Sequence, residues 1–337
     1  MKIVRTDANL QTRHLDAELR NAGHDLTLLP DGISESAFCD AVAQADLLLM
    51  CYQPITSAVI AAAQNLKGIV KYGVGIDAID IPAAMAKGIP VVNIPEYAEE
   101  TVAEGAFTMM LALAKRLPAL HEEMQTTGWA WPEERWLARD IANSTVGIVG
   151  LGRIGRSLAR MAGAGFRAKV VAYSPHTDQK AFDAAGVIRC ATLEDLLAQS
   201  DFVSIHSVLN DDTYHLIDAK AFKVMKPSAF LINVSRGAIV DEQALIQALE
   251  QGEIAGAALD VFGVEPLALQ DHPLSSLFGH DNVILSPHLT FYTSEAMHRL
   301  EAETLKRCFE ILNGQPVQIT SNDPRLRAQS ENVVFRD

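Results

Sequence analysis

The stretch Val146–Arg160, VGIVGLGRIGRSLAR, decides the fold of this chain. Its glycines, Gly150, Gly152 and Gly155, have the spacing GxGxxG directly after an apolar run that predicts a strand and at the start of a helical pattern. Gly150 allows a tight turn, Gly152 lets the backbone approach a pyrophosphate, and Gly155 lets the helix pack closely on the strand. The N–H groups that begin the helix then face the phosphates. The stretch therefore predicts a dinucleotide-binding α/β domain.

Apolar runs on both sides of this stretch extend the pattern into two parallel sheets. Seven runs, most of them separated by helical windows, begin with the glycine stretch: TVGIVG, AKVVAY, VIRC, DFVSIHS, AFLINVS, IAGAALD and NVILS. Five more come earlier in the chain: KIVRT, DLTLLP, ADLLLMCY, GIVKYG and PVVNIP. Strands that alternate with helices indicate parallel sheets. We therefore expect an α/β protein with two doubly wound parallel-sheet domains, a Rossmann cofactor domain and a flavodoxin-like substrate domain.

Two long helical patterns mark where one domain passes into the other. The pattern from Glu99 to Gln125, with an expected kink at Pro118, interrupts the alternation and connects the two sheets. The pattern Thr293–Leu312 begins after the second sheet has run out of strands, so we expect it to pack back on the first domain. The tail SNDPRLRAQSENVVFRD shows no clear period and is expected to be loosely held.

These patterns predict one discontinuous and one continuous domain. Residues 1–98 and 293–337 are expected to form the substrate-binding domain, and residues 99–292 the dinucleotide-binding domain. A length of 337 residues is typical of about two domains, and a hydrophobic content of 49% is enough to give each its own core.

Charge and cysteine content argue against several classes of protein. A net charge of −14 repels phosphate backbones and anionic lipid surfaces, so we expect neither nucleic acid nor membrane as a partner. The N-terminal residues lack a signal-peptide pattern and no apolar run approaches the ~20 residues that span a bilayer, so we expect a cytoplasmic protein. We expect no metal site and no disulfide framework, because the cysteines are widely spaced: Cys39, Cys51, Cys190 and Cys308.

The position that distinguishes NAD from NADP lacks its usual acid. Ser174, Pro175 and His176 follow the strand KVVAY, where a carboxylate for the adenosine ribose would be expected. Ser174 could help to hold a 2′-phosphate, or it could hydrogen-bond a plain ribose. Arg153, Lys180 and the imidazole of His176 are the groups available to a 2′-phosphate. The sequence therefore leaves both NAD and NADP as possible cofactors.

Three residues at predicted strand ends have the chemistry needed to reduce a carbonyl, which requires a cation and a proton donor. Arg236 follows FLINVS, and its planar fork can bind a carboxylate. Glu265 follows the next strand in ALDVFGVEP, and His288 ends the one after it. A carboxylate next to an imidazole stabilises the imidazolium. Alone, each residue has a structural explanation, such as a surface ion pair or a strand-end histidine, but the ordered set favours catalysis.

The order GLGRIG, NVSRGAIVDE, ALDVFGVEP and SPH resembles the D-isomer-specific 2-hydroxyacid dehydrogenase family over nearly the whole chain. The resemblance implies a two-domain enzyme, usually a homodimer, that interconverts a small 2-keto acid and the D-2-hydroxy acid by hydride transfer with NAD(P)(H). In it, Arg236 binds the substrate, His288 is the general acid/base and Glu265 is its partner.

The resemblance also implies contacts for the cofactor and the substrate. The stretch KYGVGIDAID resembles the family's substrate loop, in which the backbone N–H groups of Val74 and Gly75 hold the carboxylate and Lys71 adds a cation. Val208 stands where the family usually has a proline, so the adenine-side loop is expected to differ. Beside the glycines and Ser174, the positions implied near the cofactor are Thr101, Arg153, Ile154, Ser207, Val234 and Asp260, the last near the nicotinamide carboxamide.

Within the family, NIPEYAEETVAE and PHLTFYTSEA are similar to the C-terminal binding protein branch, and the chain also resembles glyoxylate-hydroxypyruvate reductases. Phe291 and Tyr292 would then shape the substrate pocket, although a role as core aromatics explains them equally well. Glu265 argues against the formate dehydrogenase branch, which has glutamine there, whereas phosphite oxidation is not excluded. The alternative function is a dinucleotide-sensing binding protein with secondary dehydrogenase activity.

Several properties stay undetermined by the sequence. Glyoxylate, hydroxypyruvate and aryl pyruvates share the carboxylate and ketone that these residues recognise, so neither the 2-keto acid nor the physiological direction is defined. For the homodimer, the candidate contact is the helix that begins at Glu99 together with the stretch GWAWPEERW. Its aromatics could anchor a partner subunit: Trp129, Trp131 and Trp136.

Overall fold

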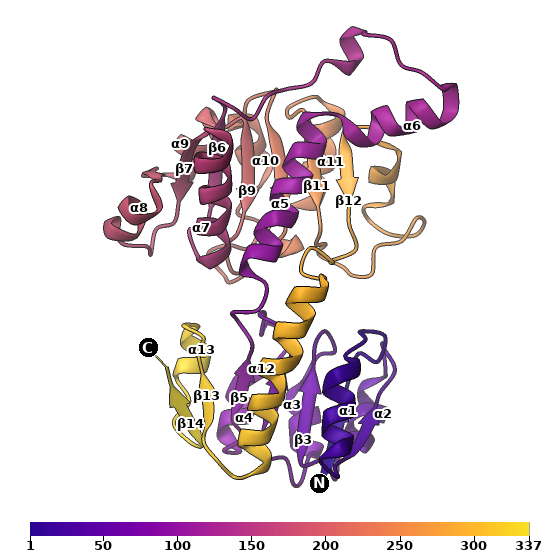
Figure 1. Ribbon diagram of the computed structural model, residues 1–337, viewed down its shortest axis with the longest axis vertical. Helices are drawn as coiled ribbons and strands as arrows, with labels where there is room; N and C mark the ends of the chain where they lie inside the picture. The colour runs from indigo at the N-terminus through magenta and orange to yellow at the C-terminus, as the bar shows by residue number, and fades with distance from the viewer. Residues whose placement is uncertain (337) are drawn as a thin grey trace. The chain divides into compact units, whose positions relative to one another are not determined.

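The computed structural model describes residues 1–336 and divides the chain into two compact units. The first comprises Met1–Ala98 and Thr293–Asp337, and the second comprises Glu99–Tyr292. Each is built on its own parallel sheet (Figure 1). The expected fold class, two α/β domains with doubly wound parallel sheets, is confirmed. The expectation that the first unit binds the substrate stays a prediction.

The first unit contains a five-stranded sheet in the order β2-β1-β3-β4-β5, with every pair parallel. All four residues of β3 are buried, as expected for a strand covered on both faces. Its strands are β1 (Lys2–Arg5), β2 (Asp25–Leu28), β3 (Leu47–Met50), β4 (Ile69–Lys71) and β5 (Val91–Asn93). The helices between them are α1 (Arg13–Asn21), α2 (Glu35–Val42), α3 (Ser57–Ala62) and α4 (Ile81–Ala86).

The C-terminal residues complete the first unit. Helix α12 (Ser294–Leu312), capped by Thr293, packs against α1, β3 and β4, as the sequence indicated. After it come β13 (Val317–Ile319), α13 (Pro324–Arg327) and β14 (Val333–Phe335).

The expectation of a loosely held tail is wrong for the described residues, because the tail closes an open strand edge. The side chain of Gln329 donates to the backbone oxygen of Val91 at 2.9 Å and accepts from its N–H at 2.7 Å. These two bonds satisfy backbone groups of the edge strand β5. Only 5% of Gln329 is exposed, so the tail is held firmly at this point.

The second unit contains a seven-stranded parallel sheet in the order β12-β11-β10-β9-β6-β7-β8. Its strands are β6 (Thr145–Val149), β7 (Lys169–Tyr173), β8 (Ile188–Arg189), β9 (Phe202–Ile205), β10 (Phe230–Asn233), β11 (Gly256–Leu259) and β12 (Val283–Leu285). Its helices are α5 (Glu99–Ala114), α6 (Leu117–Thr127), α7 (Arg153–Arg160), α8 (Gln179–Ala185), α9 (Leu193–Gln199), α10 (Ala219–Val224) and α11 (Glu242–Glu250). Helices α5 and α7 pack side by side (Figure 1).

The helix expected over Glu99–Gln125 is two helices, α5 and α6, rather than one kinked helix. The backbone of Arg116 is left-handed, with φ 50°, and this residue separates them. Pro118 is the second residue of α6, where its missing N–H leaves no hydrogen bond unmade. No residue of α6 is buried within the unit.

Candidate active site

The glycine loop between β6 and α7 has the shape that a pyrophosphate requires. Gly150 has φ 97°, and a Cβ there would lie 2.7 Å from the backbone nitrogen of Ser207. A Cβ on Gly155 would lie 2.2 Å from the carbonyl oxygen of Gly150. Gly152 caps α7 with no protein atom within 4 Å of the position of a Cβ. The loop is therefore closed toward the sheet and open beyond the helix N-terminus, which fits a dinucleotide.

The loop lies at the point where the strand order reverses. The chain runs from β6 to β7 on one side and returns to β9 on the other, and ligands of such sheets bind outside this switch point. Ser207 follows β9 and donates to the carbonyl oxygen of Val149 at 3.2 Å. The hydroxyl of Ser235 in turn donates to the carbonyl oxygen of Ser207. Val234, the residue before Ser235, is buried. Two more expected cofactor positions lie in the first turns of the adjacent helices α5 and α7: Thr101 and Ile154.

The segment after β7 is a tight turn with a cation beside it. The hydroxyl groups of Ser174 and Thr177 lie 2.8 Å apart, and the N–H of Thr177 donates to the carbonyl oxygen of Ser174 at 3.1 Å. Arg189 donates to the carbonyl oxygen of Pro175 at 3.4 Å. Arg153 pairs instead with Glu99, at 3.3 Å from Nε to Oε1. The turn therefore offers hydroxyl groups and Arg189 to the adenosine end, and the choice between NAD and NADP stays open.

His288 and Glu265 form a hydrogen-bonded pair. His288 Nδ1 lies 2.9 Å from Glu265 Oε2, and the N–H of Phe262 donates to Glu265 Oε1 at 3.0 Å. Burial raises the pKa of Glu265, but the hydrogen bond and charge of His288, the N–H of Phe262 and the charge of Arg236 outweigh it and lower the pKa overall. An ionised carboxylate can only accept, so the proton of the pair lies on Nδ1. Nε2 is then the ring nitrogen that exchanges a proton with a substrate.

Asp260 organises the turn that carries His288. The backbone of His288 is left-handed, with φ 58°. Asp260 is fully buried, and its Oδ1 accepts from Ser286 Oγ at 2.6 Å and from the N–H of Leu289 at 3.0 Å. Its Oδ2 accepts from the N–H and the hydroxyl of Thr290 at 3.1 and 2.6 Å. The sequence did not indicate this role, and the expected contact of Asp260 with the nicotinamide carboxamide stays a prediction.

The turn of Arg236 touches the loop of Glu265 through the backbone. Asn233 Nδ2 donates to the carbonyl oxygen of Arg236 at 2.9 Å and holds the turn after β10. The next residue, Gly237, packs so closely that a Cβ there would lie 1.9 Å from the carbonyl carbon of Phe262. Because β10, β11 and β12 are neighbours in the sheet, their carboxyl ends bring Arg236, Glu265 and His288 to the same edge.

The model of the D-isomer specific 2-hydroxyacid dehydrogenase NAD binding domain matches residues 107–290. The chain belongs to this family. It is 39% identical over 267 residues to glyoxylate reductase from Thermococcus litoralis. That alignment covers 77% of this chain and 78% of that protein. It is 38% identical over 296 residues to D-3-phosphoglycerate dehydrogenase from Synechocystis sp.. That alignment covers 88% of this chain but 52% of the longer relative. The sequence-based recognition of the family is confirmed.

Solved structures of the family agree with this fold. D-lactate dehydrogenase from Aquifex aeolicus, complexed with NAD and lactic acid, superimposes with a TM-score of 0.81 at 30% identity. The match covers 93% of this chain and 96% of that one. The predicted class, an oxidoreductase that interconverts 2-keto and 2-hydroxy acids with a nicotinamide dinucleotide, is thus confirmed. The dinucleotide-sensing alternative is not favoured.

An aromatic pair, Phe291 and Tyr292, lies beside His288. The rings of His288 and Phe291 meet edge to face, with centroids 6.4 Å apart at 89°. The ring of Tyr292 meets Phe291 in the same manner at 5.9 Å. Phe291 is 8% exposed, whereas Tyr292 is 43% exposed. Phe291 therefore buttresses the imidazole, and the more exposed Tyr292 is better placed to meet a ligand.

The residues that the family resemblance assigned to the substrate carboxylate belong to the first unit. Asn93 Nδ2 donates to the carbonyl oxygen of Val74 at 2.6 Å, which holds the backbone next to Gly75. Lys71 is 6% exposed and donates to the carbonyl oxygen of Cys51, with its Nζ 3.3 Å from the thiol of that residue. A role of Lys71, Val74 and Gly75 in binding substrate stays a prediction.

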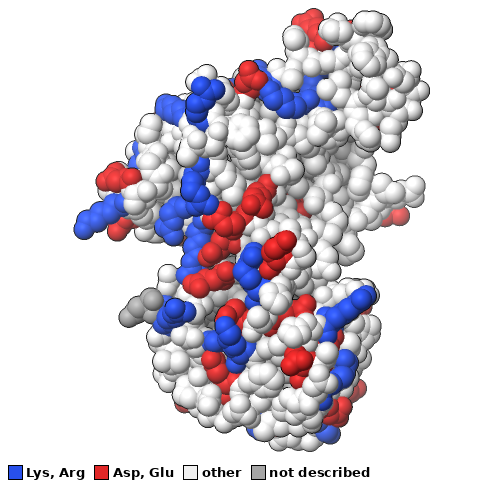
Figure 2. All heavy atoms as spheres, viewed as in Figure 1, with Lys and Arg blue, Asp and Glu red and all other residues white. Residues whose placement is uncertain are grey.

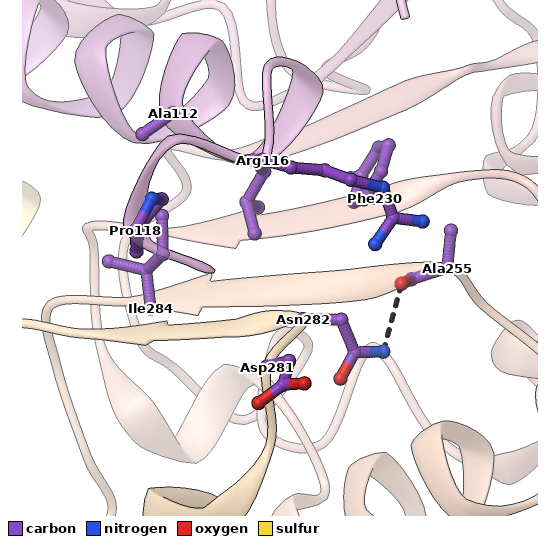
Figure 3. A pocket seen from close by; sticks show the side chains of 9 residues that line it. Ala112, Arg116, Pro118, Phe230, Ala255, Asp281, Asn282 and Ile284 are labelled. Atoms are coloured by element: carbon purple, nitrogen blue, oxygen red, sulfur yellow. Dashed lines mark hydrogen bonds between the residues drawn. The ribbon is translucent and has the colours of Figure 1, made fainter. Parts of the chain in front are cut away.

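A small pocket of the second unit lies at the amino ends of β10, β11 and β12 (Figure 3). Phe230 begins β10, and Ala255 and Asn282 directly precede β11 and β12. Asn282 Nδ2 donates to the carbonyl oxygen of Ala255 at 2.9 Å, and the side chain of Arg116 extends over the same space (Figure 3). Arg236 and His288 follow the other ends of these strands, so the pocket is separate from the predicted catalytic residues.

Residues 1–336 contain neither a candidate membrane-spanning helix nor a candidate metal-binding cluster. None of the helices there combines the length and apolar character needed to cross a bilayer. Nor does that part of the chain gather three or more His, Cys, Asp or Glu side chains into a group that could hold a metal ion.

Proposed function

We propose that this enzyme interconverts a small 2-keto acid and its D-2-hydroxy acid with His288 as the general acid and base. The observation that carries the proposal is the 2.9 Å hydrogen bond between His288 Nδ1 and Glu265 Oε2, next to Arg236. It supplies a proton donor, a counter-charge and a cation at the carboxyl edge of one sheet, which is the set that carbonyl reduction requires.

The protein side chains divide the work of the reaction. The bound nicotinamide dinucleotide supplies the hydride in reduction and accepts it in oxidation. Arg236 binds the carboxylate of the substrate and polarises the adjacent carbonyl. His288 donates the proton on Nε2 to the carbonyl oxygen as it gains charge, and Glu265 stabilises the imidazolium from which that proton comes. In the reverse direction, neutral His288 takes the proton of the hydroxyl group.

The substrate is proposed to be a small 2-keto acid of the kind that the glyoxylate reductase relatives are named for. Two features support a small pocket. Phe291 packs edge to face on the ring of His288 and limits the space on that side. Tyr292 adds a partly exposed phenol that can hydrogen-bond a polar group.

The test is the initial rate of reduced-cofactor oxidation over a panel of 2-keto acids, each with NADH and with NADPH. His288→Ala should lower turnover by about 10²- to 10⁴-fold, the usual contribution of a general acid. Its dinucleotide affinity, measured by quenching of protein fluorescence, should stay near the wild-type value. Turnover that survives the substitution, or an enzyme inactive on every acid, would contradict the proposal. The same panel establishes the preference between NAD and NADP.

We also propose that the protein is a homodimer. No residue of α6 is buried, and this helix and the segment after it expose large apolar side chains: Leu117, Trp129, Trp131 and Leu137 at 61%, 60%, 72% and 69%. Exposed tryptophans are typical anchors of a protein interface. Sedimentation should give a dimer, and Trp131→Asp should weaken it while leaving the monomer folded. A wild-type monomer at working concentration would refute this proposal.

A cytoplasmic location, with no nucleic acid or membrane partner, completes the proposal. Figure 2 shows basic and acidic side chains interspersed on the face in view, and the whole chain has a net charge of −14. The four cysteines are free, as is usual in a reducing compartment. Retention on heparin at physiological salt, or sedimentation with anionic vesicles, would argue against it.

A further inference from the structure

The loop that carries Glu265 is fixed at three consecutive residues. The N–H of Phe262 donates to Glu265 itself at 3.0 Å. The N–H of Gly263 donates to Glu242 Oε1 at 2.7 Å. The carbonyl oxygen of Val264 lies 3.0 Å from His272 Nε2. Glu242 begins α11 and His272 comes from the segment before β12, so two separate parts of the unit hold the loop.

The hydrogen bonds of His272 define which of its nitrogens carries the proton. The N–H of Leu274 donates to Nδ1 at 3.1 Å, so Nδ1 is an acceptor. The proton of the neutral ring must then be on Nε2, from which it is donated to the carbonyl oxygen of Val264. His272 therefore links two backbone groups and fixes Val264, the residue directly before Glu265.

Glu242 occupies a matching position on the other side of the loop. Burial raises the pKa of Glu242, and the N–H of Gly263, which donates to its carboxylate, opposes that rise. The carboxylate of Glu265 also faces it and adds to the rise. A Cβ on Gly263 would come within 3.0 Å of Glu242 Oε2, so the absent side chain lets the loop backbone reach this carboxylate.

The same segment of chain brings Arg236 and Glu242 to the loop. Gly237 touches the carbonyl carbon of Phe262, and Glu242 binds the next N–H along the loop. Asp241 caps α11 by accepting from the N–H groups of Gln243 and Ala244, which fixes the start of the helix beside Glu242. These contacts therefore fix the position of the loop relative to the turn of Arg236.

We propose that Glu242 and His272 are positioning residues for the reaction, which hold the Glu265 carboxylate against His288. This inference rests on the proposed function of the Glu265–His288 pair. Gly263, Val264 and Glu265 are exposed, so side-chain packing alone does not hold the loop. The hydrogen bonds to Glu242 and His272 supply the constraint that packing does not.

The first test compares Glu242→Ala with Glu242→Gln. Alanine removes the acceptor of the Gly263 N–H, and we expect turnover to fall by about tenfold to a hundredfold, as for a small misplacement of reacting groups. Glutamine keeps an acceptor oxygen and should rescue most of the loss. Glu250→Ala, at the exposed last residue of the same helix, is the matched control and should leave turnover unchanged. Dinucleotide affinity and thermal melting of each variant report whether it is folded.

The second test is a double-mutant cycle with Glu265→Gln. If Glu242 acts through Glu265, Glu242→Ala should cost little further turnover once Glu265 is changed, and His272→Ala should behave in the same way. Losses that multiply independently, or a folded Glu242→Ala enzyme with wild-type turnover, would overturn the positioning role. A Glu265→Gln enzyme with wild-type turnover would instead contradict the proposed function.

Discussion

The carboxylate of Asp260 accepts the N–H groups of both residues that follow His288 in the chain. His288 itself has a left-handed backbone, a conformation that costs a residue other than glycine about 1–3 kcal/mol and persists only where its surroundings enforce it. The buried carboxylate provides that enforcement. The direction of the imidazole is therefore determined by a residue on the neighbouring strand end.

Asp260→Asn should disrupt this arrangement. Four donors point at the two oxygens of Asp260, and the amide group of asparagine would direct its own N–H bonds at two of them. We expect turnover to fall and the free energy of unfolding to decrease by about 1–3 kcal/mol. Steady-state kinetics and urea denaturation measure the two effects, with the exposed Asp281→Asn as the control. Wild-type turnover in a folded Asp260→Asn protein would rule out the positioning role.

The pH dependence should have opposite signs in the two directions. Reduction needs protonated His288, so its rate should fall as the pH rises, whereas oxidation needs the neutral ring and should become faster. The pKa of Glu265 is lowered, so this residue stays ionised to a lower pH than an ordinary glutamate and can stabilise the imidazolium there. Glu265→Gln removes this counter-charge and should lower the rate of reduction. Rate profiles in both directions test these expectations, and a Glu265→Gln enzyme with the wild-type reduction rate would show that the pair is uncoupled.

Two glycines of the cofactor loop should respond differently to alanine. Gly152→Ala adds a methyl group to open space, so the free energy of unfolding should hardly change while dinucleotide affinity falls. Gly155→Ala places its Cβ 2.2 Å from the oxygen of Gly150 and should cost about 1–3 kcal/mol of stability, as in other overpacked sites. Denaturation and fluorescence titration of both variants check the contrast. Equal losses of stability would show that the loop is not shaped as described.

His206 should make folding less favourable in mild acid. Burial lowers the pKa of His206 to about 3, and within the described part of the chain its buried Nδ1 has no hydrogen-bond partner. Between its ordinary value of 6.5 and about 3, the unfolded chain binds a proton that the folded protein does not, so stability decreases as the pH falls.

The slope from this residue is at most about 1.4 kcal/mol for each pH unit. His206→Gln removes the titrating group, so the difference in unfolding free energy between variant and wild type should change from pH 7 to pH 5. A difference that is constant over this range would mean that His206 titrates normally in the folded protein.

Patterns of neighbouring residues in the sequence predicted the strands, the glycine loop and the candidate reaction residues. The central strands of the two large sheets, such as β3, β9 and β10, are short apolar runs, because a strand buried on both faces needs apolar residues throughout. The glycines after β6 were predicted from their spacing between a strand and a helix, and a Cβ would not fit at Gly150 or Gly155. Arg236, Glu265 and His288 were predicted as a set because each lies at or shortly after the end of a predicted strand.

Other features depend on contacts between residues far apart in the sequence. The tail has no period because Gln329 and Val91, which hold it to the sheet edge, are 238 residues apart. The break at Arg116 depends on one left-handed residue, which the continuous helical pattern concealed.

The sequence by itself determined the fold class and the dinucleotide loop, and it predicted the set of reaction residues, because spacing and residue type carry that information. Only the tertiary structure decided which groups hold that set in place. Asp260, Glu242 and His272 meet the reaction loops through hydrogen bonds between separate strand ends and helices. Such bonds leave no periodic signal, because they form only when the folded backbone brings donor and acceptor within about 3 Å.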